Sequence, residues 1–291
     1  MEQEKLISLQ QEELSNKKQL IVTLLKPMIA NLYYWEQYGF VESDFDPDKN
    51  AHLDKKIGDF VIGMDSYSQF RLLDLSGKEV YRINRQDNGK IVKSLALQDK
   101  SNRDYYQETT GLKKNQIYLS PLNLNQENGI LEFPYKPMIR GIAPIFDAQG
   151  TKLGTVVINF SAERFLELLK KDNLYSFILL DRFGNYLVSK DSIKEFSHLI
   201  PSSRDVTFQE EFPDLMDSLG RVATTSLWHK GDLWIKTELD FKTELAQTPL
   251  FQHKFADIRT NNKWILIKHL DSATLNARLQ SEIFSIFLIN L

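Results

Sequence analysis

The stretch DKSNRDYYQETTGLKKNQIYLSPLNLNQENGILEFPYKPMIRGIAPIFDAQGTKLGTVVINF, residues 99–160, decides the fold of this chain. It joins a cluster of arginine and tyrosine residues to two apolar segments, 136–146 and 152–160, that we expect to be paired strands. Each segment carries one polar residue, Arg140 or Asn159, where the pattern alone asks for an apolar one. This combination predicts a small polar pocket on a sheet rather than a catalytic centre.

The bulk properties of the chain narrow its class. Its 291 residues favour two domains, and 42% hydrophobic with 26% charged residues is an ordinary globular composition. A net charge of −3 gives no basic surface, so we exclude nucleic acid as a partner. The absence of cysteine removes disulfides and thiol chemistry, and it fits an extracytoplasmic compartment without requiring one.

No motif for a metal, a cofactor or catalysis is present. The five histidines show no HxxH or HExxH spacing, and neither a Gly-rich phosphate loop nor a GxSxG elbow occurs. We therefore expect no metal, no cofactor and no catalytic residue. A pair of carboxylates brought together by the fold is the enzymatic alternative that the sequence leaves open.

A repeated passage predicts two copies of one module. The pattern Leu-Leu-Asp-x-x-Gly, with its aspartate at Asp74 and again at Asp181, lies in two expected hairpins, 69–84 and 177–187. Further strands are expected at 116–120, 136–146 and 152–160 after the first hairpin, and at 222–228, 232–240 and 263–270 after the second. The predicted fold class is α+β, with each module an antiparallel sheet flanked by helices.

Helices are expected at both ends and between the modules. Residues 2–38 predict one long helix, with a possible kink at Pro27, whose polar first twenty residues extend from the body or pair with a partner helix. Ser161 is expected to cap a helix joining the modules. A last helix from Asp271 ends in the apolar residues 283–291, which either dock on their own domain or begin a membrane span of about 20 residues.

The chain resembles the double Cache sensor domains, in which two PAS-like modules stand outside the cytoplasmic membrane of bacteria. The motifs that carry the resemblance are LLDLSG at 72–77, SNRDYY at 101–106, IYLSP at 117–121, PMIRGIAPIFDAQG at 137–150 and GTVVIN at 154–159. The resemblance extends over roughly residues 30–275 and is looser in the second module.

The resemblance implies a domain order and a role. The expected parts are a long helix at 1–40, a membrane-distal module at 41–165, a membrane-proximal module at 166–270 and a helix at 271–291 leading to a membrane span. The implied function is the periplasmic ligand-sensing part of a sensor histidine kinase, working as a homodimer. A diguanylate cyclase, a chemoreceptor or a free periplasmic binding protein are the alternatives.

The resemblance also implies a ligand site. In members that bind amino acids, an arginine matching Arg103 holds the ligand carboxylate, helped by aromatic residues matching Tyr105 and Tyr106. Where those members carry an aspartate for the ligand ammonium, this chain has Asn159. Tyr118 and Ser120 lie in a matching motif and complete the candidate set together with Arg140.

Asn159 decides the expected ligand. A buried ammonium without a counter-charge loses the strongest contribution to its binding, so a small carboxylate fits better than an amino acid. A four-residue loop at 147–150 would place Arg140 and Asn159 on one face of a hairpin. The alternative is structural: ion pairs of Arg103 and Arg140 with local acids such as Asp104, Glu108 or Glu132, and tyrosines that merely pack. The second module offers no equivalent cluster and is expected to relay the signal.

Overall fold

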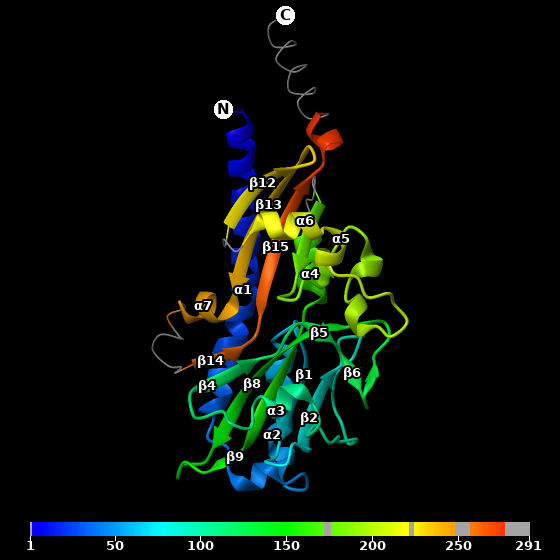
Figure 1. Ribbon diagram of the computed structural model, residues 1–291. Coiled ribbons are helices and arrows are strands. Elements are labelled where there is room, and N and C mark those ends of the chain that lie inside the picture. The colour runs from blue at the N-terminus through cyan, green and yellow to red at the C-terminus, as the bar shows by residue number, and fades with distance from the viewer. Residues whose placement is uncertain (1, 172–175, 221–223, 248, 250–256, 277–291) are drawn as a thin grey trace, which may run out of the picture. The chain divides into compact units, whose positions relative to one another are not determined.

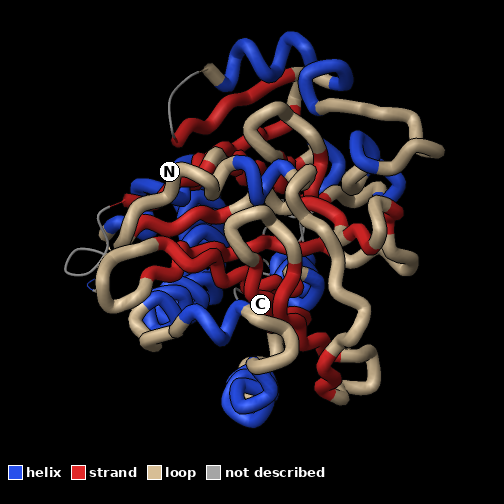
Figure 2. Tube along the Cα trace, turned by 90° about the horizontal axis from the view of Figure 1, so that it is seen from below, coloured by secondary structure: helices blue, strands red, loops and turns tan. Residues whose placement is uncertain are grey.

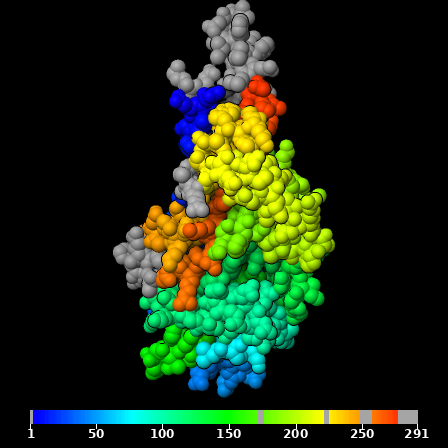
Figure 3. Space-filling view, in the orientation of Figure 1, coloured from blue at the N-terminus to red at the C-terminus, as the bar shows by residue number. Residues whose placement is uncertain are grey.

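The computed structural model describes residues 2–171, 176–220, 224–247, 249 and 257–276; the others are grey in Figures 1 and 3. The chain divides into two compact units. The first module consists of Val22–Phe165 and Phe241–Asn262, and the second module of Met1–Ile21, Leu166–Asp240 and Lys263–Leu291. Both units contain helices and mainly antiparallel strands, which Figure 2 colours blue and red, and this composition confirms the predicted α+β class.

The long helix α1 (Glu2–Glu36) passes through Pro27 without ending and contributes to both units. In the second module Leu14 is 1% exposed, and Lys17 donates from Nζ to the carbonyl of Leu169 at 2.8 Å. The expectation that the first twenty residues extend away from the body is therefore wrong. A narrow stripe of buried side chains is enough to dock a helix that is otherwise polar.

The first module is built on an eight-stranded sheet. Its strands, in spatial order, are β14 (Asp257–Thr260), β4 (Gln116–Leu119), β8 (Pro137–Phe146), β9 (Lys152–Ser161), β1 (Tyr67–Leu73), β2 (Glu79–Arg85) and β3 (Ile91–Lys93), while β5 (Asn123–Leu124) pairs with β8. A small hairpin, β6 (Gln126–Glu127) and β7 (Ile130–Leu131), lies between β5 and β8 in the chain. The module also contains the helices α2 (Leu53–Ile62), α3 (Asp104–Gln107) and α7 (Phe241–Ala246), with 3-10 turns at Glu42–Phe45 and Asn50–His52.

One face of this sheet packs on α1. The rings of Trp35 and Phe70 lie 4.8 Å apart, and both residues are fully buried. Gly141 of β8 allows the close approach, since a Cβ there would lie 2.8 Å from the sulfur of Met28. Because side chains alternate along a strand, the neighbours of Phe70, Gln69 and Arg71, lie on the opposite face.

The second module repeats the arrangement with five strands. They are β11 (Tyr186–Val188), β10 (Ser176–Leu180), β15 (Lys263–Leu270), β13 (Asp232–Asp240) and β12 (Thr224–His229) in spatial order. The first module has the same spatial order, in which β2, β1, β9, β8 and β4 correspond in turn to these five strands. The helices are α4 (Glu163–Lys170), which begins in the first module, α5 (Phe208–Glu211) and α6 (Pro213–Leu219), with 3-10 turns at Ser192–Lys194 and Ser197–Leu199.

Both Leu-Leu-Asp-x-x-Gly passages form the predicted turns. The Oδ1 atom of Asp74 accepts from the amides of Ser76 (2.8 Å) and Lys78 (3.0 Å), and Gly77 has φ +87°. Asp181 and Gly184 (φ +84°) repeat the pattern. An aspartate that binds backbone amides and a glycine with positive φ reverse the chain within four residues.

Two expectations about helix ends have other outcomes. Ser161 does not cap the joining helix, because it is the last residue of β9, paired with Met138, and α4 begins at Glu163. The apolar residues 283–291 lie outside the described part of the chain, as do residues 222 and 223 of an expected strand. None of the helices that are described combines the length and hydropathy needed to cross a membrane.

Candidate functional site

Strand register lines up a row of polar residues across the first module's sheet. Asn84 of β2 is paired with Gln69 of β1, Gln69 with Asn159 of β9, and Asn159 with Arg140 of β8. We call these four residues the polar row. Arg140 and Asn159 thus lie on one face, as expected, but the expected four-residue loop at 147–150 is wrong. The loop has five residues, 147–151, and the strand register shifts between Ile145 and Phe146, which together pair Arg140 directly with Asn159.

Arg140 is a buried cation with neutral partners. It is 1% exposed, and its guanidinium donates to the side-chain oxygens of Asn123 (2.7 Å) and Asn125 (2.9 Å). Burial, with repulsion from Arg71 and Arg103 partly offset by Tyr105, lowers the pKa of Arg140 to about 10. The site thus holds a guanidinium whose charge is poorly compensated.

The ion pairs with local acids, the structural alternative for Arg103 and Arg140, are not formed. Among the described residues, no carboxylate lies within ion-pair distance of Arg140 or Arg103. Glu132 instead pairs with Lys136 at 2.6 Å, and Arg103 donates to the side-chain oxygen of Gln126.

Tyr105 of α3 lies among three guanidinium groups. Its ring centre is 5.3 Å from the guanidinium carbon of Arg140 and 5.9 Å from that of Arg103, and its hydroxyl is 3.3 Å from Nη1 of Arg71. Cations over the face of an aromatic ring are attracted by its quadrupole. Tyr105 therefore holds three cationic side chains close together without neutralising them.

Asn159 is completely buried and only half satisfied. Its Nδ2 donates to Oε1 of Gln69 at 2.8 Å. Within the described part of the chain, neither its Oδ1 nor Nε of Arg140 has a hydrogen-bond partner. A buried acceptor and a buried donor without partners, on two paired residues, are unusual in a native core.

A charged network continues the site along β1 and β2. Glu79 lies 3.2 Å from Nε of Arg71 and 3.5 Å from Nη1 of Arg82, and its other close cation is Lys100 at 4.0 Å. Glu127 is bound by Arg82 at 3.2 Å. The cations of the site are Arg71, Arg82, Lys100, Arg103 and Arg140, against the two carboxylates Glu79 and Glu127.

This network was not predicted from the sequence. Its only signal is the alternation of polar and apolar residues in Gln69–Leu73 and in Arg82–Asn84, typical of strands with one polar face. The approach of Lys100 and Glu127 depends on loops that no pattern in the sequence positions.

The remaining candidates have individual positions. Tyr106 points its hydroxyl to the carbonyl of Leu75 at 2.7 Å, at the turn of the first hairpin. The Ser120 hydroxyl accepts from the amide of Arg140 at 2.9 Å and donates to the carbonyl of Pro121. Both of its partners are backbone groups, so Ser120 holds the backbone in place at this point of the site. Tyr118 is buried near Arg140, and its pKa is raised to about 12, chiefly by burial.

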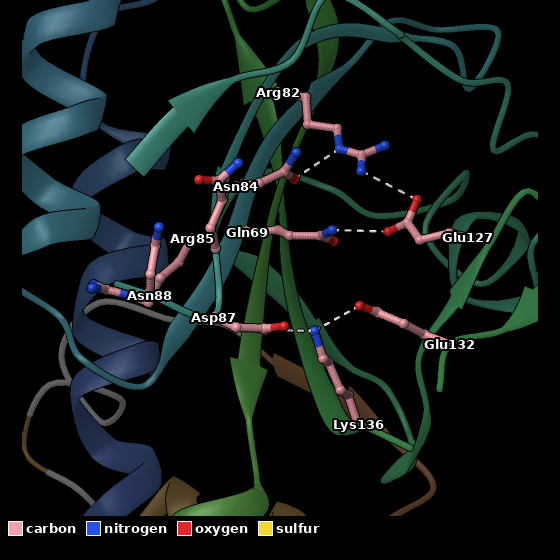
Figure 4. Close-up of a pocket in the computed structure, with 10 residues that line it drawn as sticks. Gln69, Arg82, Asn84, Arg85, Asp87, Asn88, Glu127, Glu132 and Lys136 are labelled. Atoms are coloured by element: carbon pink, nitrogen blue, oxygen red, sulfur yellow. Dashed lines mark hydrogen bonds and ion pairs between the residues drawn. The ribbon is translucent and has the colours of Figure 1, made fainter. Parts of the chain in front are cut away.

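A groove opens at the outer end of the polar row. This cavity of about 540 Å³ is lined by Gln69, Arg82, Asn84, Arg85, Gln86, Asp87, Asn88, Glu127, Glu132 and Lys136. Figure 4 shows Gln69 and Arg82 both reaching Glu127, at 2.9 and 3.2 Å, and Lys136 between Asp87 and Glu132. Although burial opposes ionisation of Glu127, hydrogen bonds from Gln69 and the nearby Arg82 lower its pKa to about 2.

The arrangement suits binding rather than catalysis. In the part of the chain that is described, no three histidine, aspartate or glutamate side chains lie close enough to hold a metal. The site offers guanidinium and amide donors and the Tyr105 hydroxyl around the buried cation Arg140, whose own partners are neutral. Such a set recognises a small anion by charge and hydrogen bonding.

Solved structures with the same fold are sensory domains. A sensory box/GGDEF family domain from Vibrio parahaemolyticus has a TM-score of 0.74 at 20% identity, covering 94% of this chain and 98% of that one. The extracellular domain of the histidine kinase vpHK1S-Z8 has a TM-score of 0.67 at 21% sequence identity, covering 91% of this chain and 95% of that one. The ligand-binding domain of the Pseudomonas fluorescens chemoreceptor CtaA, solved with L-serine, has a TM-score of 0.53 at 13% sequence identity, covering 93% of this chain and 99% of that one.

Sequence comparison adds the family. No curated protein matches the chain significantly. The family model for the sensor domain of bacterial histidine kinases matches residues 10–249, well over half of the chain. The chain belongs to the bacterial histidine kinase sensor domain family, a family of sensory rather than catalytic domains.

Proposed function

We propose that this chain is the periplasmic sensing part of a transmembrane sensor histidine kinase and that its first module binds a small carboxylate. The observation that carries the proposal is the excess of buried positive charge around Arg140, whose own partners are neutral amides. A diguanylate cyclase or chemoreceptor output remains the second candidate, because solved domains of both kinds share the fold.

The physical reason for an anion is the cost of a buried charge. A buried guanidinium without a counter-ion is destabilising, and the depressed pKa of Arg140 reflects that cost. A ligand carboxylate near Arg140, Arg103 and Tyr105 would restore the balance with charge-assisted hydrogen bonds. Part of the binding free energy would come from relieving this strain in the free protein.

The groove gives a route to the site. Gln69 and Asn84 belong to both the groove lining and the polar row, and the next residue along the row is the buried Asn159. A ligand entering from the groove would meet Gln69 first. Displacement of the Gln69 amide would open the way to Asn159 and Arg140.

Signal transfer would follow from a population shift. We assign binding to residues 41–165 of the first module and relay to residues 166–240 and 263–270 of the second, with α1 and the helix beginning at 271 leading to membrane helices. A ligand that binds one arrangement of the module better shifts the population toward it. Homodimers would pass that shift to the output domain.

Binding is tested by calorimetry and thermal shift with a panel of small carboxylates. We expect at least one to bind the purified domain and to raise its melting temperature. Arg103→Met should weaken that binding at least tenfold, because the half-buried guanidinium contributes a charge-assisted contact. The matched control is Arg164→Met, on the exposed face of α4, with unchanged affinity. Failure of every carboxylate to bind would refute the proposal.

A further inference from the structure

Resting on the proposed function, we infer that the ligand is a hydroxycarboxylate, whose hydroxyl group binds between Asn159 and Arg140 while its carboxylate neutralises the cationic cluster. The inference starts from two buried atoms, Oδ1 of Asn159 and Nε of Arg140, that have no hydrogen-bond partner among the described residues. One needs a donor and the other an acceptor. A hydroxyl group is both.

The orientation of the Asn159 amide is fixed by a chain of hydrogen bonds. The Glu127 carboxylate can only accept, so the Gln69 group facing it at 2.9 Å is Nε2, a donor. The Oε1 of Gln69 therefore faces Asn159 and also accepts from Arg71. Because Gln69 presents an oxygen, Asn159 must present Nδ2 to it, which leaves Oδ1 as the free acceptor.

This orientation separates three kinds of ligand. An unsubstituted carboxylate would leave Oδ1 of Asn159 unsatisfied, which carries a penalty for a buried group. An amino acid would satisfy it, but its ammonium would lie near Arg140, Arg71 and Arg103, where the carboxylates Glu79 and Glu127 already pair with Arg71 and Arg82. A hydroxy acid supplies the donor without adding positive charge. The polar row thus selects oxygen over nitrogen at the carbon next to the carboxylate.

The test compares ligands that differ in one group. Lactate, propionate and alanine form one series, and malate, succinate and aspartate form a second of larger size. By titration calorimetry, we expect the hydroxy acid of at least one series to bind roughly tenfold tighter than its unsubstituted partner, and tighter still than its amino acid. Equal affinity for hydroxy and unsubstituted acids would overturn this inference and leave the proposed function intact. No binding of any acid would overturn both.

A single substitution should reverse the preference. Asn159→Asp puts a carboxylate where an ammonium group would need it, so alanine or aspartate should gain at least tenfold over the matching hydroxy acid. The control is Asn128→Asp, the same change at an exposed residue in the turn between β6 and β7, outside the polar row and the groove, which should leave the ligand order unchanged. If Asn159→Asp folds and keeps the wild-type order, the hydroxyl does not lie at Asn159. If it does not fold, the wild-type series decides alone.

Discussion

The same row of the sheet is filled in opposite ways in the two modules. Gln69 lies five residues before Asp74, and Ser176 lies five residues before Asp181. Register then pairs Gln69 with Asn159, and Asn159 with Arg140, in the first module. In the second module it pairs Ser176 with His269, and His269 with Trp234. The row that holds an undercompensated cation in one module holds an aromatic pair in the other.

The aromatic pair of the second module forms a packed core. The rings of Trp234 and His269 are stacked with centroids 3.7 Å apart and an angle of 10°, and His269 contacts Asp232 at 2.8 Å. The rings of Phe208 and Phe212 also pack against Trp234. A shared strand order therefore does not imply a shared site, because function depends on the side chains that the fold carries. This agrees with a second module that relays rather than binds, which remains a prediction.

The largest loss of stability should come from removing the indole side chain of Trp234. Trp234 is 3% exposed, so Trp234→Ala should lower the free energy of unfolding by about 3–5 kcal/mol through lost burial and a cavity. Urea denaturation followed by circular dichroism measures it. Trp228→Ala, at a site 43% exposed, is the control and should change stability by less than about 0.5 kcal/mol. If Trp234→Ala also weakened ligand binding by the first module under conditions where the variant stays folded, the second module would not be purely structural.

The two glycine turns offer a second comparison. Both Gly77 and Gly184 have positive φ, but a Cβ at Gly77 would meet Cα of Ser101 and the ring of Tyr106 at 2.8 Å, whereas at Gly184 the nearest atom is 3.9 Å away. Gly184→Ala should cost about 1 kcal/mol of backbone strain. Gly77→Ala should cost about 2–4 kcal/mol, since overpacking adds to the strain. Equal losses in thermal denaturation would show that the Ser101 segment yields easily.

Acid should act on the first module through Glu127. Its pKa in the folded protein is about 2, below that of the unfolded chain, so its contribution is present above pH 4.5 and is lost as the pH falls toward 2. Glu127→Gln should therefore be less stable than the wild type at pH 6, by about 1–2 kcal/mol after screening, with the gap narrowing by pH 3. Urea titrations at several pH values measure it. A gap independent of pH would mean that the carboxylate is not held by Gln69 and Arg82 as the structure shows.

The corresponding acid of the second module gives a smaller effect of the same sign. Burial opposes ionisation of Asp232, yet hydrogen bonds from His269 and Ser272 lower its pKa. Asp232→Asn should cost less than Glu127→Gln at pH 6, because fewer charged partners surround it. If Asp232→Asn proved the more damaging, the electrostatic difference between the modules would be smaller than their side chains indicate.

The sequence by itself determined the elements and much of their pairing. Alternating apolar residues and Asp-x-x-Gly turns are local signals, so strands such as β8 and β9 and the shared face of Arg140 and Asn159 were predicted from spacing. Their direct pairing was not, because it depends on a register shift between Ile145 and Phe146. The repeated motif likewise predicted two copies of one module, although their common strand order came only from the structure.

Only the tertiary structure decided what surrounds Arg140. It placed β1 between β9 and β2, which brought Arg71, Gln69 and Glu79 to the site, and it turned the hydroxyls of Tyr106 and Ser120 to backbone carbonyls and amides. It also buried part of the polar start of α1. These outcomes depend on contacts between residues far apart in the chain, where burial and hydrogen bonding outweigh any local preference.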